Sequence, residues 1–217
     1  MSGVRILVTG FGPFPGAPYN PTQPLVARLT RLRRPAFADV ELASHIFPVT
    51  YRAVDQQLPE LLAKLRPQAL LMFGLASRTA HLRIETRARN AVTMLWPDAA
   101  QTRVRKSSIG LGPDAMTFGP HTARLLRAAR ATGIDARASR DAGAYLCNYL
   151  SWRAIEAACT DGHLQCAAFI HVPLLARDKP LRKGFGRITL EELVDAGEAM
   201  LMEMVKQARQ RARRRRA

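Results

Sequence analysis

Residues 69–74 read Ala-Leu-Leu-Met-Phe-Gly, an uninterrupted apolar run that ends in a glycine. A short run without polar alternation predicts a strand that is buried on both faces and then leaves the sheet in a loop. Toward the N-terminus, helical and strand patterns alternate over residues 51–65, 40–49, 20–33 and 4–9. Alternation of this kind predicts an α/β protein with a largely parallel sheet and helices on both faces.

The pattern continues toward the C-terminus after an irregular, arginine-rich segment from Gly74 to Asp98. We expect helices over about 114–131 and after Cys147, strands over 134–139 and 166–173, and a final amphipathic helix. Thr189 and Glu192 have the spacing of a capping box at the start of that last helix.

The length of 217 residues fits a single large domain, which we place at residues 1–205. The net charge is +16, and residues 206–217 contain seven basic residues and no acid. A basic run of this kind is typical of a solvated, frayed extension. As an alternative, the tail could add weak, salt-sensitive contact with nucleic acid or an anionic surface.

No apolar run approaches the length of a membrane span, and the N-terminus lacks the pattern of a signal peptide. The chain contains three cysteines without a C-x-x-C pair or the spacing of metal ligands, so disulfides and structural zinc are poorly supported. We therefore expect a cytoplasmic protein. Cys159 and Cys166 fall in apolar patterns and are assigned to packing.

The most informative stretch for chemistry is residues 141–152, Asp-Ala-Gly-Ala-Tyr-Leu-Cys-Asn-Tyr-Leu-Ser-Trp. Its spacing places Cys147 near a helix start, where the helix dipole and unpaired backbone N–H groups favour a thiolate. The same N–H groups could stabilise an oxyanion formed when the thiolate attacks a carbonyl. The alternative is a small apolar side chain buried in the core, and for an isolated cysteine this is the commoner case.

The loop at residues 10–16, Gly-Phe-Gly-Pro-Phe-Pro-Gly, combines turn-forming residues with two phenylalanines. Phe11 and Phe14 could present aromatic faces to a small ligand at the carboxyl end of the first strand. Either ring could instead pack onto the core. The loop does not match a phosphate-binding motif, because G-x-G-x-x-G is absent.

Two further residues could complete a nucleophilic site. His171 closes an apolar strand, where it is either a structural residue or a group placed for proton transfer near neutral pH. Glu85 is the only acid between Gly74 and Asp98. By itself it is most simply interpreted as a surface ion-pair partner of nearby arginines, and the alternative is a carboxylate that orients a histidine.

Taken together, these segments resemble the pyroglutamyl peptidase I family over nearly the whole chain. The matching motifs are Val-Thr-Gly-Phe-Gly-Pro-Phe with Asn20-Pro21, Ala-Gly-Ala-Tyr-Leu-Cys-Asn-Tyr-Leu, and Phe-Ile-His-Val-Pro. The resemblance implies a three-layer α/β/α sandwich with a mostly parallel, twisted central sheet. It also implies a catalytic triad of Cys147, His171 and Glu85, with Phe11 and Phe14 holding the pyrrolidone ring of the substrate.

The family resemblance further implies a thiol peptidase that takes N-terminally pyroglutamylated peptides, needs no metal or cofactor and forms homo-oligomers. The chain departs from the family pattern around Glu85. Thr79 and Leu95 stand where the family usually has arginine, Ile84 stands in place of a proline, and neighbouring arginines could compensate. The alternative is a divergent α/β homologue with altered specificity or weak activity, binding anions or nucleic acid through its tail.

Overall fold

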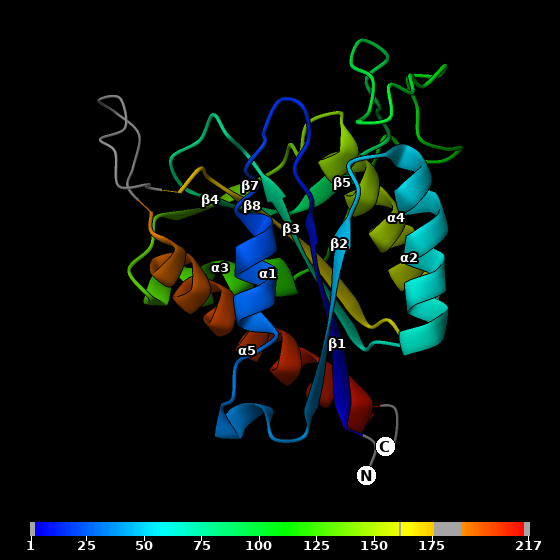
Figure 1. Cartoon of the computed structure of the whole chain (residues 1–217). Coiled ribbons are helices and arrows are strands. Elements are labelled where there is room, and N and C mark those ends of the chain that lie inside the picture. Colours follow the sequence, from blue (N-terminus) through cyan, green and yellow to red (C-terminus); the bar gives the residue numbers. More distant parts are fainter. Residues whose placement is uncertain (1–2, 161, 176–187, 215–217) are drawn as a thin grey trace.

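The computed structural model describes residues 3–160, 162–175 and 188–214, with side chains described up to residue 210 (Figure 1). The strands are β1 (Val4–Phe11), β2 (Val40–Phe47), β3 (Ala69–Leu75), β4 (Leu82–Glu85), β5 (Arg87–Arg89), β6 (Ala115–Thr117), β7 (Ala136–Ser139) and β8 (Cys166–Val172). The helices are α1 (Thr22–Leu29), α2 (Tyr51–Leu65), α3 (His121–Ala131), α4 (Leu146–Thr160) and α5 (Leu190–Arg214), with a 3-10 turn at Pro35–Phe37.

In the described part of the chain, a six-stranded sheet has the order β2-β1-β3-β8-β4-β7. The first four strands in this order are parallel, whereas β4 is antiparallel to β8 and parallel to β7. The register places Gly74 of β3 opposite His171 of β8, and Arg83 of β4 opposite His171 on its other side. Three strands that are distant in sequence therefore meet at one level of the sheet.

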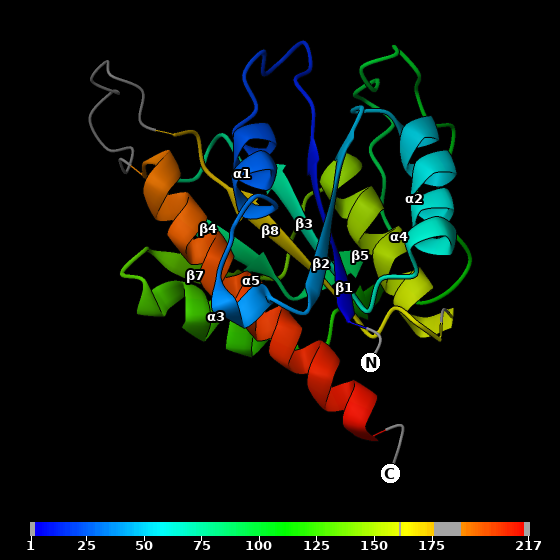
Figure 2. The ribbon, with the colours of Figure 1, turned by 60° about the horizontal axis from the view of Figure 1, so that its bottom comes forward.

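Helices cover both faces of this sheet, so the expected three-layer α/β/α architecture is confirmed (Figure 2). α1, α3 and α5 lie on one face, and α2 and α4 lie on the other. Alternate residues of β3 point to opposite layers: Leu71 and Phe73 pack with the first group of helices, and Leu70 and Met72 with the second. Both faces of the strand are buried, which explains why its sequence shows no polar alternation.

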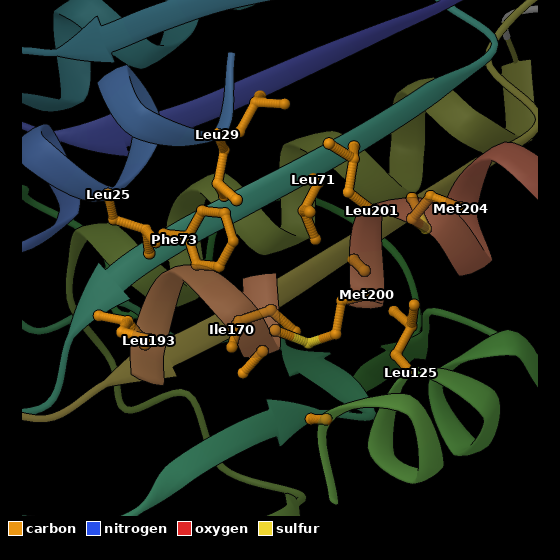
Figure 3. Packing of buried hydrophobic residues seen from close by; sticks show 14 of the residues in the cluster. Leu25, Leu29, Leu71, Phe73, Leu125, Ile170, Leu193, Met200, Leu201 and Met204 are labelled. Carbon is orange, nitrogen blue, oxygen red and sulfur yellow. The ribbon is translucent and has the colours of Figure 1, made fainter. Parts of the chain in front are cut away.

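The first of these two cores is shown in Figure 3, where side chains of β3 and β8 meet those of α1, α3 and α5. Leu25 and Leu29 come from α1, and Leu193 and Met200 come from α5. All four are fully shielded from solvent. A buried side chain of this size stabilises the fold by about 1.5–3 kcal/mol relative to an exposed one, so this layer anchors the sheet firmly.

The second core supports the segment that contains Cys147. Phe47, Phe169 and Trp152 are buried there between the sheet, α2 and α4. α2 has the predicted bounds, with Pro59 inside it and the Thr50 side chain accepting a hydrogen bond from the Ala53 amide as its N-cap. This packing fixes the position of α4 on the sheet face.

One predicted helix begins later than expected. Residues 114–120 were expected to be helical, but Ala115–Thr117 form β6, which pairs with β5. α3 starts only at His121, after Gly119 with a φ of 103° and Pro120 as the N-cap. A glycine in this conformation interrupts a right-handed helix, and proline is best tolerated in the first turn of a helix.

Other bounds differ by smaller amounts. α1 starts at Thr22 with Pro21 as its N-cap and ends at Leu29, so it is shorter than the predicted helix. Cys166 is buried as expected, but Cys159 is exposed, so its assignment to packing was wrong. The capping box is confirmed, because the Glu192 amide donates to the Thr189 hydroxyl and the Thr189 amide donates to the Glu192 carboxylate.

The C-terminal basic segment is not simply a frayed extension. α5 continues across residues 205 and 206 to Arg214, Ala208 is buried, and Arg209 forms an ion pair with Asp39. Residues 215–217 of the predicted tail lie outside the described residues. In the part of the chain that the structure describes, no helix is both long enough and apolar enough to span a membrane.

Candidate active site

Cys147 occupies the first turn of α4, one residue after the helix begins at Leu146. Backbone N–H groups in a first turn have no acceptor within the helix, so they are available to an anion. The sulfur lies against Gly74: a Cβ atom at Gly74 would stand 2.8 Å from Cys147 Sγ and 2.6 Å from the Phe169 ring. Only a glycine at the end of β3 leaves room for the thiol at this point.

His171 and Glu85 form a direct hydrogen bond beside this thiol. His171 Nδ1 lies 2.8 Å from Glu85 Oε1, and the Glu85 side chain is completely buried. The two residues are 86 positions apart in sequence and are brought together by the antiparallel pairing of β4 with β8. The carboxylate therefore fixes the Nδ1–H tautomer of the ring, and Nε2 is the nitrogen left for chemistry.

The pKa of His171 reports the surroundings of its ring. Burial disfavours the imidazolium and on its own lowers the pKa. The Cys147 sulfur, as a nearby negative charge and hydrogen-bond partner, and the Glu85 carboxylate outweigh burial and raise the pKa to about 9. Near neutral pH the His171 ring is therefore mostly protonated.

Arg83 adds a second contact to the buried carboxylate. Its Nη2 atom lies 3.2 Å from Glu85 Oε1, and the same atom donates to the Ser139 hydroxyl at 2.8 Å and to the Asp141 carbonyl. Glu85 Oε2 has no hydrogen-bond partner among the described residues. Glu85 thus does pair with an arginine, but in a buried setting, and the expectation of a wet surface ion pair was wrong.

Asn148, next to Cys147, is a positioning residue that sequence reasoning missed. Its buried side chain donates to the carbonyls of Arg89 and Ala91, both at 2.8 Å, and accepts from the Arg89 amide at 2.9 Å. These bonds tie the start of α4 to β5 and the loop after it. The available signal was an amide residue in the first turn of an apolar helix, where a buried side chain needs partners.

The segment before Cys147 is held from the same loop. The Thr93 amide donates to the Ala144 carbonyl at 2.6 Å, and the Tyr145 hydroxyl donates to the Pro97 carbonyl at 2.9 Å. Asp98, another residue whose role was missed, accepts amide hydrogen bonds from Tyr51, Ala100 and Thr102. Hydrogen bonds therefore connect the loop after β5 with the segment that leads into α4.

The two phenylalanines of the first loop occupy different environments. Phe11 ends β1, is 3% exposed and packs against Phe47, with ring centroids 6.1 Å apart. Phe14 is half-buried and packs against the same core, which also contacts Cys147. The Asn20 side chain donates to the Gly12 carbonyl at 3.0 Å and fixes the loop between the two rings. Phe14 is therefore the more accessible ring of the two.

A cavity of about 330 Å³ opens beside His171. Its walls come from residues 75–79, Arg83 and residues 141–143. A larger cavity of about 590 Å³, lined by residues between 30 and 42, lies at the β2 edge of the sheet and includes none of the candidate residues. Of these two cavities, only the smaller one is lined by a candidate residue, His171. Among the described residues, no group of three or more His, Cys, Asp or Glu side chains is arranged to hold a metal ion.

A helix-borne thiol paired with a buried histidine and carboxylate on an α/β/α fold defines a cysteine-type peptidase. The sequence pattern of the family described as pyroglutamyl peptidase matches residues 4–207. The chain belongs to this family.

This chain aligns with individual relatives over nearly the full length of both proteins. The chain is 30% identical over 204 residues to the pyrrolidone-carboxylate peptidase of Thermococcus onnurineus, covering 94% of this chain and all of the relative. The structure of the pyrrolidone carboxyl peptidase of Fervidobacterium islandicum superposes with a TM-score of 0.83 at 27% identity, covering 94% of this chain and 99% of that one. The Thermococcus litoralis enzyme gives a TM-score of 0.85 at 24% identity, covering 95% and 96%, and so supports the fold.

Proposed function

We propose that this protein is a cysteine exopeptidase that removes pyroglutamate from the N-terminus of peptides. The observation that carries the proposal is the 2.8 Å bond between His171 and a fully buried Glu85, next to the thiol of Cys147. A buried carboxylate on a histidine beside a cysteine is the arrangement that activates a thiol for acyl transfer. Membership of the pyroglutamyl peptidase family supplies the substrate class.

In this mechanism the Cys147 thiolate attacks the carbonyl carbon that joins pyroglutamate to the next residue. The developing oxyanion accepts hydrogen bonds from first-turn N–H groups of α4, each stabilising the transition state by about 3 kcal/mol. His171 gives its Nε2 proton to the leaving amine as the C–N bond breaks, which leaves a thioester on Cys147. Water, deprotonated by the same ring, then attacks the thioester and releases free pyroglutamate and the thiolate.

Glu85 acts as the positioning residue in this scheme. It holds the ring with Nε2 toward the substrate and stabilises the imidazolium by its charge. Phe14 provides an aromatic face for the pyrrolidone ring, and Phe11 forms the wall behind it in the same core. Thr79 and Leu95 replace the usual family arginines, but Arg78 and Arg83 line the cavity with Thr79, and Arg103 donates to the Leu95 carbonyl at 2.7 Å. Guanidinium groups of other residues therefore lie near Thr79 and near Leu95.

The test is release of a fluorophore from a pyroglutamyl amide by the native protein and by Cys147→Ala. We expect turnover by the native protein and none above background for the variant, because the alanine has no nucleophile. Cys159→Ala is the matched control. Cys159 is an exposed cysteine near the other end of α4, about 18 Å along the helix at 1.5 Å per residue. Undiminished turnover by Cys147→Ala would eliminate the thiol mechanism.

We further propose the cytoplasm as the compartment, since no disulfide joins Cys147, Cys159 and Cys166, all of which lie in the described residues. A homo-oligomer and a weak contact of the basic tail with nucleic acid remain secondary proposals. Light scattering tests the first, and salt-dependent binding that is lost on removal of residues 206–217 tests the second. An anion-binding function without peptidase activity is not favoured, because it gives no reason for a buried Glu85 on His171.

A further inference from the structure

The cavity beside His171 has no role in the reaction as described above. It measures about 330 Å³, near the roughly 300 Å³ lower end of small-ligand pockets, and thus suits about one amino-acid residue. Arg78, from the loop after β3, and Arg83, from β4, both line it. His171, the proton donor of the proposed reaction, therefore lines the same cavity as two guanidinium groups.

The order of the strands indicates which part of a substrate reaches this cavity. Phe11 lies at the end of β1, the Cys147 sulfur lies over Gly74 of β3, and His171 belongs to the next strand, β8. Arg83 lies on β4, one strand further. Moving across the sheet, one passes from the proposed ring site to the nucleophile, then to the acid that protonates the leaving amine, and then to the cavity. The cavity therefore lies on the leaving-group side.

The charges around the cavity are not balanced. Arg83 is paired with the buried Glu85, and Asp141 is paired with Arg89 at 2.9 Å. In the reaction proposed above, the charges of the Cys147 thiolate and the His171 imidazolium offset each other. Arg78 is exposed and forms no ion pair within the part of the chain that the structure describes. Among the described residues, one cavity-lining cation is thus left without a counter-charge.

A further guanidinium group, that of Arg87, lies next to the 139–141 segment that borders the cavity. Arg140 adjoins Asp141, and its carbonyl accepts a hydrogen bond from Arg87 Nε at 2.8 Å. The surroundings of the cavity are therefore positive, and they favour a negatively charged group over a neutral one of the same shape.

We propose that this cavity receives the residue that follows pyroglutamate and that Arg78 makes the enzyme prefer an acidic side chain at that position. The inference rests on the proposed removal of pyroglutamate and specifies the substrate class further. Arg78 acts here as a specificity-determining residue, and Arg83 acts mainly by holding Glu85 and the 139–141 segment.

The experiment compares two blocked peptides, pyroglutamyl-Glu-Ala-Ala-amide and pyroglutamyl-Gln-Ala-Ala-amide, by the rate of pyroglutamate release. The pair differs only in a carboxylate against a carboxamide, and the C-terminal amide removes the terminal charge. We expect kcat/KM to be about fivefold higher for the glutamate peptide, the factor that one ion pair near 4 Å gives in bulk water. Raising the ionic strength to about 0.5 M should reduce this ratio, because exposed charges are screened.

Variants at Arg78 test whether this residue causes the preference for the glutamate peptide. Arg78→Gln should bring the ratio close to one, Arg78→Glu should invert it, and Arg78→Lys should retain most of it because the charge remains. The matched control is Arg127→Gln, which removes the same charge from an exposed position on α3 and should leave the ratio unchanged.

The possible failures are distinguishable. Equal cleavage of the two peptides by the native protein would overturn the proposed preference while leaving pyroglutamate removal intact. A ratio that is unchanged in Arg78→Gln would overturn the role of Arg78. If neither peptide is cleaved by the folded native protein, the proposed function itself fails and the preference fails with it.

Discussion

Replacing Glu85 with glutamine tests how much the site depends on a buried charge. The substitution keeps the size of the side chain and an oxygen that can face His171 Nδ1 at 2.8 Å, but it removes the negative charge. A hydrogen bond to a charged group contributes about 1.5–3 kcal/mol. At 1.4 kcal/mol per tenfold, we expect kcat/KM for a pyroglutamyl amide to fall about 10- to 150-fold.

The loss of kcat/KM in Glu85→Gln should also depend on pH, and in a defined direction. The Glu85 charge helps raise the pKa of His171 to about 9, so the imidazolium of the native protein is lost only as pH rises through that value. Glu85→Gln lowers the pKa of His171. The pH above which activity is lost therefore becomes lower in the variant. A 2 kcal/mol effect corresponds to about 1.5 pH units at 1.36 kcal/mol per unit. The deficit of the variant should therefore be larger near pH 8.5 than near pH 6.

The assay is the pH profile of kcat/KM for the native protein, Glu85→Gln and Glu60→Gln, an exposed glutamate on α2 that serves as the control. Thermal unfolding should verify that all three are folded. A Glu85→Gln profile with its alkaline limit still near 9 and a rate within about threefold of native would refute the argument, since the buried charge would then have no measurable effect on the histidine.

Two further predictions concern the support of the site. Gly74→Ala would place a methyl group 2.6 Å from Phe169 and 2.8 Å from Cys147 Sγ, so we expect a stability loss of about 1–3 kcal/mol in urea unfolding together with reduced turnover. Gly162→Ala, with open space around the new methyl, should have little effect. Asn148→Ala removes the buried side chain that pairs with partly buried backbone groups of Arg89 and Ala91, and it should cost about 1–3 kcal/mol in the same assay; an unchanged midpoint would contradict this.

Much of the fold follows from the sequence, because local patterns report burial directly. The apolar run at 69–73 indicated a strand covered on both faces, and the helix at 51–65 was predicted with its observed bounds. The start of α4 beside Cys147 could also be predicted, since small residues and a glycine lead into an apolar helix. Helix ends were less certain: residues 114–120 have helical spacing, but Gly119 and Pro120 delay α3 to His121.

The pairing of Glu85 with His171 could not be obtained from local patterns. The sequence identified both residues and, through the family resemblance, suggested their roles. Their distance depends on β4 running antiparallel to β8, a register set by tertiary packing. The same holds for the burial of Phe11 and for the cavity that joins Arg78 to His171. Periodicity in the sequence records whether a side chain is buried; which partner it meets is decided by the order and direction of strands in the folded sheet.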